Sequence, residues 1–251
     1  MKPSSIVPVP SLLRALLVLV AGALAGCATP GPLHVYSLAR DRGEKSIADH
    51  REGQAAEAPS FLEEEDQLTG FAYDPFTDHF FLRLAPGNKI RVVDRPARAI
   101  KREYTAEGLT TGGDLALVPR SGHLFFLDGT PTRVVETSRF GKVVGTFPLE
   151  GVSSASGLAC DPQKNQLLAL HADGRQLSFH DLQGKRLSAI TLSKAAAGSL
   201  ALDAERGELY APLREKAGVL GIFALDGKLL RELPLPAAFV DLGPRSFVRV
   251  F

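Results

Sequence analysis

A short phrase repeats four times along this chain, and this repeat restricts the fold more than any other feature of the sequence. Each copy consists of a small or polar residue, three mostly apolar residues and a turn-forming residue. Successive copies begin about 42 to 44 residues apart, at 70–75, 114–119, 157–162 and 199–204. A second short apolar stretch follows each copy after a turn. The pattern therefore predicts four two-stranded hairpins.

The second half of each repeat predicts two further strands. Short apolar stretches at 90–93, 133–135, 176–179 and 220–223 read as third strands, and glycines at 141, 184 and 227 provide the positive φ of the tight turns that follow. Four short antiparallel strands per 40-odd residues are typical of a propeller blade. We predict blades near 68–111, 112–154, 155–197 and 198–241, within a domain at 33–251.

The two ends of this domain predict one more blade. Residues 33–38 and 42–45 read as a third strand with its hairpin, and residues 246–251 read as an opening strand. Joining them closes the ring with a composite blade and removes exposed sheet edges. Residues 52–65 read as a surface insertion. The predicted fold is an all-β propeller of four-stranded antiparallel blades, about five in number, with six blades or an incomplete ring as alternatives.

The start of the chain has the layout of a secretory signal. A basic residue, an apolar run at 15–26 and small residues at its end precede Cys27. The run is shorter than the roughly 20 apolar residues that a spanning helix needs. The segment 24–27 resembles the lipobox of bacterial lipoproteins. That resemblance implies a cleaved signal peptide at 1–26, a tether at 27–32 and acylation of Cys27, and Ala28 in place of aspartate implies an outer-membrane protein facing the periplasm.

Charge and cysteine content limit the partners and the chemistry. The formal charge of +1 becomes about −1 once the signal is removed, which argues against a nucleic-acid partner. With Cys27 acylated, Cys160 is the one remaining thiol, so no internal disulfide forms. Its apolar neighbours predict a small buried hydrophobe rather than a nucleophile.

From Phe71 to Leu235, about two-thirds of the chain, the sequence resembles NHL-type and SdiA-regulated propellers. Their blades open with glycine, two apolar residues, any residue, aspartate and proline, as at 157–162, and turn on Asp-Gly-Lys, as at 226–228. This resemblance implies the fold. The related regucalcin and gluconolactonase enzymes hold a divalent metal with a glutamate, asparagines and an aspartate. Here Thr69 stands at the glutamate position, and the chain's asparagines, Asn88 and Asn165, lie beside turns.

Strand alternation predicts where a ligand binds. If first strands run away from one face, the second-to-third loops and the blade-to-blade connections all return to it. We place six candidate ligand-face residues there: Asp66, Asp114, Asp128, His171, Asp173 and Glu215. Their oxygens suffice for a calcium ion, which leaves calcium open, although solvated loops look the same. We predict no catalytic residue, no metal ligand and no cofactor. His171 and Asp173 lie two residues apart at a turn, and they read better as solvent-facing side chains than as a general-base pair.

Three functions fit these features. The favoured hypothesis is an envelope-anchored, non-enzymatic propeller that is held on the lipid membrane through Cys27 and binds an envelope protein or a small molecule. The second is a metal-dependent lactonase or esterase of the regucalcin and gluconolactonase type. The third is a structural subunit of an outer-membrane assembly.

Overall fold

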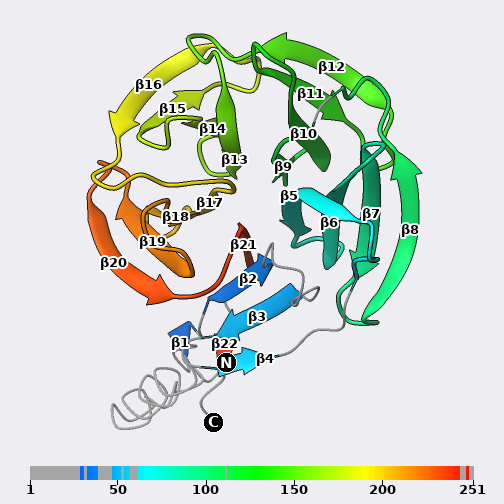
Figure 1. Ribbon diagram of the computed structural model, residues 1–251, viewed down its shortest axis with the longest axis horizontal. Coiled ribbons are helices and arrows are strands. Elements are labelled where there is room, and N and C mark those ends of the chain that lie inside the picture. The colour runs from blue at the N-terminus through cyan, green and yellow to red at the C-terminus, as the bar shows by residue number, and fades with distance from the viewer. Residues whose placement is uncertain are drawn as a thin grey trace, which may run out of the picture. The chain divides into compact units, whose positions relative to one another are not determined.

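The protein is a β-propeller of five four-stranded antiparallel sheets, which confirms the predicted fold class (Figure 1). The computed structural model describes residues 29–30, 33–38, 47–51, 54–56, 61–110, 112–243 and 247–248. The chain divides into two compact units, and the propeller is the unit Leu33–Pro244. Within the described part of the chain, no helix has the length and apolar character required to cross a bilayer.

Four blades are continuous in sequence, and each runs from its innermost to its outermost strand in chain order. The repeat produces this order because each tight turn joins neighbouring antiparallel strands. The strands are β5 (Gln67–Asp74), β6 (His79–Ala85), β7 (Lys89–Asp94) and β8 (Ala99–Thr105); β9 (Leu115–Val118), β10 (His123–Asp128), β11 (Arg133–Thr137) and β12 (Val143–Pro148); β13 (Ala155–Asp161), β14 (Gln166–His171), β15 (Gln176–His180) and β16 (Arg186–Thr191); and β17 (Ala201–Asp203), β18 (Glu208–Pro212), β19 (Val219–Ala224) and β20 (Leu229–Pro234).

The fifth blade is composite, as predicted, but its strands differ from the predicted ones. It consists of β21 (Phe239–Gly243), β2 (His34–Leu38), β3 (Ile47–Arg51) and β4 (Gln54–Ala56), in that order. The segment at 33–38 is therefore the second strand rather than the third, and the predicted insertion at 52–65 contains the fourth strand.

The predicted opening strand at 246–251 is also wrong. Its described part, β22 (Phe247–Val248), pairs with β1 (Thr29–Pro30) in a separate two-stranded sheet. The strand that opens the fifth blade is β21, which pairs with β2 along its whole length. Both segments begin with phenylalanine and valine and have one charged residue in third position, Asp241 in β21 and Arg249 in 247–251, so the apolar pattern alone did not distinguish them.

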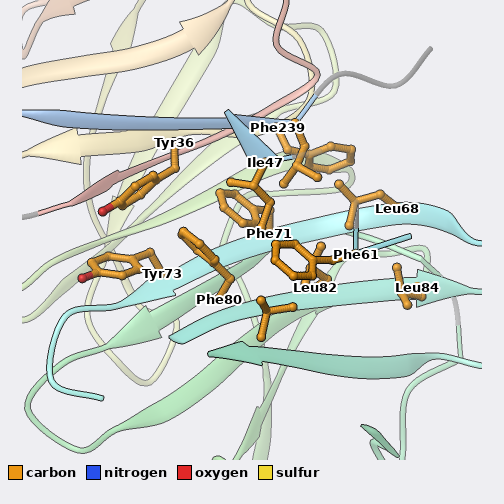
Figure 2. Packing of buried hydrophobic residues seen from close by; sticks show 12 residues of the cluster. Tyr36, Ile47, Phe61, Leu68, Phe71, Tyr73, Phe80, Leu82, Leu84 and Phe239 are labelled. Atoms are coloured by element: carbon orange, nitrogen blue, oxygen red, sulfur yellow. The ribbon is translucent and has the colours of Figure 1, made fainter. Parts of the chain in front are cut away.

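The hydrophobic core lies between neighbouring blades. Successive side chains of a strand point to opposite faces, so each blade contributes to two core layers. Between the fifth and first blades an aromatic cluster fills this layer (Figure 2). The Tyr36 ring lies 4.9 Å from that of Tyr73 and 4.8 Å from that of Phe80 between ring centres. This packing joins the composite blade to the first continuous one.

Candidate functional site

The strand directions define two faces of the propeller. We call the side with the second-to-third loops and the blade-to-blade connections the loop face, and the side with the first-to-second and third-to-fourth turns the turn face. All six candidate residues lie at the loop face, because Asp66 and Asp114 precede first strands, Asp128 and His171 end second strands, and the others lie in second-to-third loops. Sharing a face does not by itself bring them together, and each has its own surroundings.

Asp128 is fully buried and holds a network between the first two blades. Its Oδ1 lies 3.2 Å from the guanidinium of Arg83 and accepts the backbone N–H of Thr110 at 2.9 Å. Its Oδ2 accepts the Thr110 hydroxyl and the Arg133 guanidinium, both at 2.9 Å. The Arg83 side chain also donates to the carbonyl oxygen of Leu127 at 2.6 Å. Asp128 therefore compensates a buried arginine, and its oxygens are occupied.

Asp66 has a comparable role beside the first blade. It forms an ion pair with the fully buried guanidinium of Arg91, and its Oδ2 accepts the backbone N–H of Glu63 at 2.8 Å. Burial by itself raises the pKa of Asp66, but the hydrogen bonds from Glu63 and Arg91 outweigh it and bring that pKa below its usual value. Neither Arg83 nor Arg91 was anticipated from sequence, since both interrupt strands that read as apolar.

Two carboxyl groups, the buried Asp114 and the half-buried Asp241, tie together the innermost strands of different blades. Oδ2 of Asp114 accepts the backbone N–H of Leu158 at 3.0 Å, and Asp241 accepts that of Tyr73 at 2.6 Å. Burial raises the pKa of each carboxyl to about 7, and the charge of Asp241 contributes to the rise at Asp114. These groups satisfy backbone donors at strand edges, a structural task. Sequence reasoning missed Asp241 because its strand was not recognised.

His171 belongs to a short hydrogen-bonded chain inside the third blade. Its Nε2 lies 2.9 Å from the hydroxyl of Ser178, which lies 2.8 Å from Nε2 of His180. Nδ1 of His180 donates to the carbonyl oxygen of Gly184 at 3.0 Å. Burial lowers the pKa of both histidines. Ser178 and His180 are fully buried, so the chain links strands within the blade.

Asp173 and Glu215 are exposed and lie in neighbouring loops. Oδ1 of Asp173 accepts the backbone N–H groups of Arg175 and Gln176, which fixes its turn. Arg214 donates to the backbone carbonyl of Asp173 at 2.9 Å, and Arg175 lies 3.8 Å from the Glu215 carboxylate. The two acidic residues therefore shape the rim between the third and fourth blades.

The loop face contains two hollows. The larger, with a volume of about 1060 Å³, lies beside the second-to-third loop and the outer strand of the second blade, and the smaller, of about 300 Å³, lies beside the second-to-third loop of the fourth blade. Threonines and prolines dominate the wall of the larger one, with Phe147, Val152 and two charged residues, Arg133 and Glu150. Arg133 is held by Asp128, so this hollow has a fixed cationic group in a largely uncharged wall.

The residues that would correspond to a lactonase metal site do not fit one. The hydroxyl of Thr69 donates to the backbone carbonyl of Arg83. Asn88 accepts a hydrogen bond from Arg83 on the loop face, whereas Asn165 lies at a turn on the opposite face, and both have positive φ. No group of three or more histidine, cysteine or acidic side chains suited to a metal ion occurs among the described residues.

The two cysteines have separate outcomes. Cys160 is half-buried at the edge of the core between the second and third blades, and burial raises the pKa of its thiol to about 12. The group is therefore a protonated thiol at neutral pH. Cys27 and the predicted signal peptide lie outside the described residues.

Comparison with known proteins identifies the fold and no family. The sequence matches no family model and no curated protein. A chain of a nidogen–laminin complex is similar in structure, with a TM-score of 0.61 at 12% identity over 84% of this chain and 98% of that one. Glutaminyl cyclase of Myxococcus xanthus gives 0.52 at 16% identity over 70% and 71%, and a protein of unknown function from Bacteroides caccae gives 0.51 at 15% identity over 81% and 73%. At these identities the similarity establishes that the chain has a β-propeller fold.

Proposed function

We propose that this protein is an envelope-anchored lipoprotein whose propeller is a non-enzymatic binding module that engages its ligand at the loop face. The fold alone does not select this function, because similar solved structures include both a chain of a protein complex and an enzyme. The NHL-type resemblance is likewise a statement about blade structure. The argument therefore depends on the contacts of the loop-face residues.

The observation that carries this proposal is that hydrogen bonds from Asp128 hold Thr110 and Arg133 in the wall of the larger hollow. Asp128 fixes Arg133 at the wall, and Arg83 is neutralised from behind. A preformed, partly apolar hollow with few oriented polar groups is typical of a binding site. The fixed guanidinium of Arg133 favours a ligand or partner segment with a carboxylate or another hydrogen-bond acceptor.

A cross-linking experiment tests this site in cells. A photoreactive side chain replaces Thr146, an exposed residue in the wall of the hollow, and the matched control carries it at Ser188, an exposed residue of the equivalent outer strand in the third blade. We expect a discrete adduct from position 146 that disappears when Arg133→Glu is added. Identical products from both positions, or none from position 146, would contradict the proposed binding site.

The lipid anchor is tested separately. Cells fed labelled palmitate should incorporate it into the wild-type chain and not into Cys27→Ser. The wild-type protein should sediment with membranes and leave them only in detergent, because several acyl chains hold a protein on a bilayer without a spanning helix. Label incorporation that persists in Cys27→Ser would refute the assignment of the anchor.

A further inference from the structure

Two phenylalanines project from the turn face of the first and second blades. Phe76 and Phe140 are 73% and 74% exposed, the highest values among the large hydrophobic side chains that the structure describes. Phe76 lies in the turn between β5 and β6, and Phe140 in the turn between β11 and β12. Exposed apolar side chains that gather on one face are typical of a contact surface.

Hydrogen bonds and an ion pair fix the backbone of both turns, so the two phenylalanines have defined positions on the surface. Asp74 accepts the backbone N–H of Phe76 at 3.0 Å and pairs with Arg139 at 2.8 Å, which links the two turns. The Arg102 guanidinium lies 4.6 Å from the ring centre of Phe140 and donates to the backbone carbonyl of Arg139. The ring keeps its other side open.

The turns of this area contain more basic than acidic residues. The turns of the first two blades, 75–78, 95–98, 119–122 and 138–142, contain five basic residues and one acidic residue. The corresponding turns of the third and fourth blades contain four basic and three acidic residues. On the described loop-face segments the balance is reversed, with nine acidic and four basic residues. Among the described segments, the side with the two phenylalanines is therefore the more basic one.

The chain enters the propeller at this face. β2 is the second strand of the fifth blade, and His34 at its start pairs with Gly243 at the end of β21, so it lies where first-to-second turns lie. Cys27 precedes His34 by seven residues. An extended chain of that length reaches at most about 25 Å. A lipid anchor at Cys27 would therefore be attached to the propeller through a strand that begins at the turn face.

We propose that the turn face of the first and second blades rests on an anionic phospholipid surface, with Phe76 and Phe140 inserted between the headgroups. Exposed aromatic side chains surrounded by lysine and arginine match the chemistry of such a surface. The acidic loop face with its hollows then points away from the membrane. The proposal extends the proposed lipid anchor but is measured without it.

The experiment uses the chain from Ala28 onward, which contains every strand of the five sheets and carries no acyl group. The protein has no tryptophan, so Phe76→Trp and Phe140→Trp each introduce a single fluorescent reporter. The matched control is Ala217→Trp, at an exposed position of the loop face. Vesicles are phosphatidylcholine alone or mixed with phosphatidylglycerol, each with brominated acyl chains that quench inserted tryptophan.

We expect a blue shift and quenching for the two turn-face reporters with the anionic vesicles, and neither effect for the loop-face control. Equal quenching of all three reporters, or none with either vesicle type, overturns the proposal. In the second case the patch serves an acidic protein partner instead. Because no acyl chain is present, this result is independent of palmitate labelling at Cys27, so the two proposals fail separately.

A charge reversal locates the contact. Lys142 and Lys228 occupy equivalent positions after the glycine of their turns, but their blades lie on opposite sides of the ring (Figure 1). Lys142→Glu should weaken binding to anionic vesicles by roughly fivefold or more, since one basic residue near such a surface is worth about that factor. Lys228 lies on the far side of the ring, and charges farther apart than about 8–10 Å are largely screened by salt. Lys228→Glu should therefore change the affinity for anionic vesicles by less than about twofold. Equal losses would place the contact elsewhere on this face.

Discussion

The carboxylate of Asp241 accepts a hydrogen bond of 2.6 Å from the backbone N–H of Tyr73, a residue 168 positions earlier in the chain. The bond joins the innermost strand of the composite blade to that of the first continuous blade. An innermost strand has one edge with no neighbouring strand, and its N–H groups need acceptors. A side-chain carboxyl provides one here, at the place where the ring closes.

Asp241→Asn should change the pH dependence of stability. Burial raises the folded-state pKa of Asp241 to about 7 from an ordinary value of 3.8. Its stabilising contribution is therefore complete below 3.8 and is lost as pH rises to about 7. Asparagine keeps the acceptor for Tyr73 without a charge. Relative to wild type, the variant should gain about 1–3 kcal/mol of unfolding free energy between pH 4 and pH 8. This gain is smaller than the free energy that corresponds to the whole pKa difference, because Asp241 keeps some solvent contact.

Urea titrations across this pH range measure the change, and Asp173→Asn is the control whose difference from wild type should stay constant between pH 4 and pH 8. Hydrogen bonds from the backbone N–H groups of Gln176 and Arg175 lower the pKa of Asp173, so its contribution is present above 3.8 and is lost on acidification. If the difference in unfolding free energy between wild type and Asp241→Asn did not vary with pH, this result would contradict the assigned pKa.

The histidine chain of the third blade should make the protein sensitive to acid. Burial lowers the pKa of His171 and His180 in the folded state, so their contribution is present above the ordinary value of 6.5 and is lost as pH falls through the folded pKa. His180→Gln should cost about 1–2 kcal/mol at pH 7.5, where its bonds to Ser178 and Gly184 are lost. This cost should shrink toward pH 5, as shown by chemical denaturation at both pH values. A constant cost would mean that His180 does not titrate in this range.

Removing Asp128 should be far more damaging than removing a loop-face carboxylate that has no buried partner. Asp128→Ala leaves Arg83 buried without its counter-charge and should cost about 3–5 kcal/mol. Asp173→Ala removes an exposed turn acceptor and should cost less than about 1 kcal/mol. Thermal unfolding of both variants beside wild type checks the difference. Comparable losses of stability would show that the ion pair between Asp128 and Arg83 stabilises the fold no more than the exposed turn at Asp173 does.

Two loop glycines should differ in their tolerance of alanine. Gly87 and Gly174 occupy second-to-third loops and have φ of +91° and +74°. A Cβ at Gly87 has no atom within 4 Å, whereas one at Gly174 lies 2.1 Å from the carbonyl oxygen of Ala196. Gly87→Ala should cost about 1–2 kcal/mol of backbone strain. Gly174→Ala should cost about 1–3 kcal/mol more, since the backbone of Ala196 has to move. Thermal melting midpoints measure both, and equal costs would argue against this close approach.

The sequence predicted the parts of the fold that local patterns encode. Each continuous blade has its four strands within one repeat, so alternation and turn glycines sufficed. The composite blade joins Phe239–Gly243 to His34–Leu38, and no local pattern reports a pairing between such distant segments. The polar networks were missed for the same reason. Arg83 reads as a flaw in a strand until its partner Asp128, 45 residues away, is placed beside it.

The composition of the fifth blade also sets an order of events in biogenesis. Its strands β2 to β4 are synthesised first, but the strand that completes their sheet follows about 180 residues later. Throughout that interval these strands have an open edge, which is a target for proteases and for other unfolded chains. Survival of the protein therefore depends on how quickly β21 is made, and a synonymous change that slows translation near the end of the gene would lower its yield without altering a single contact.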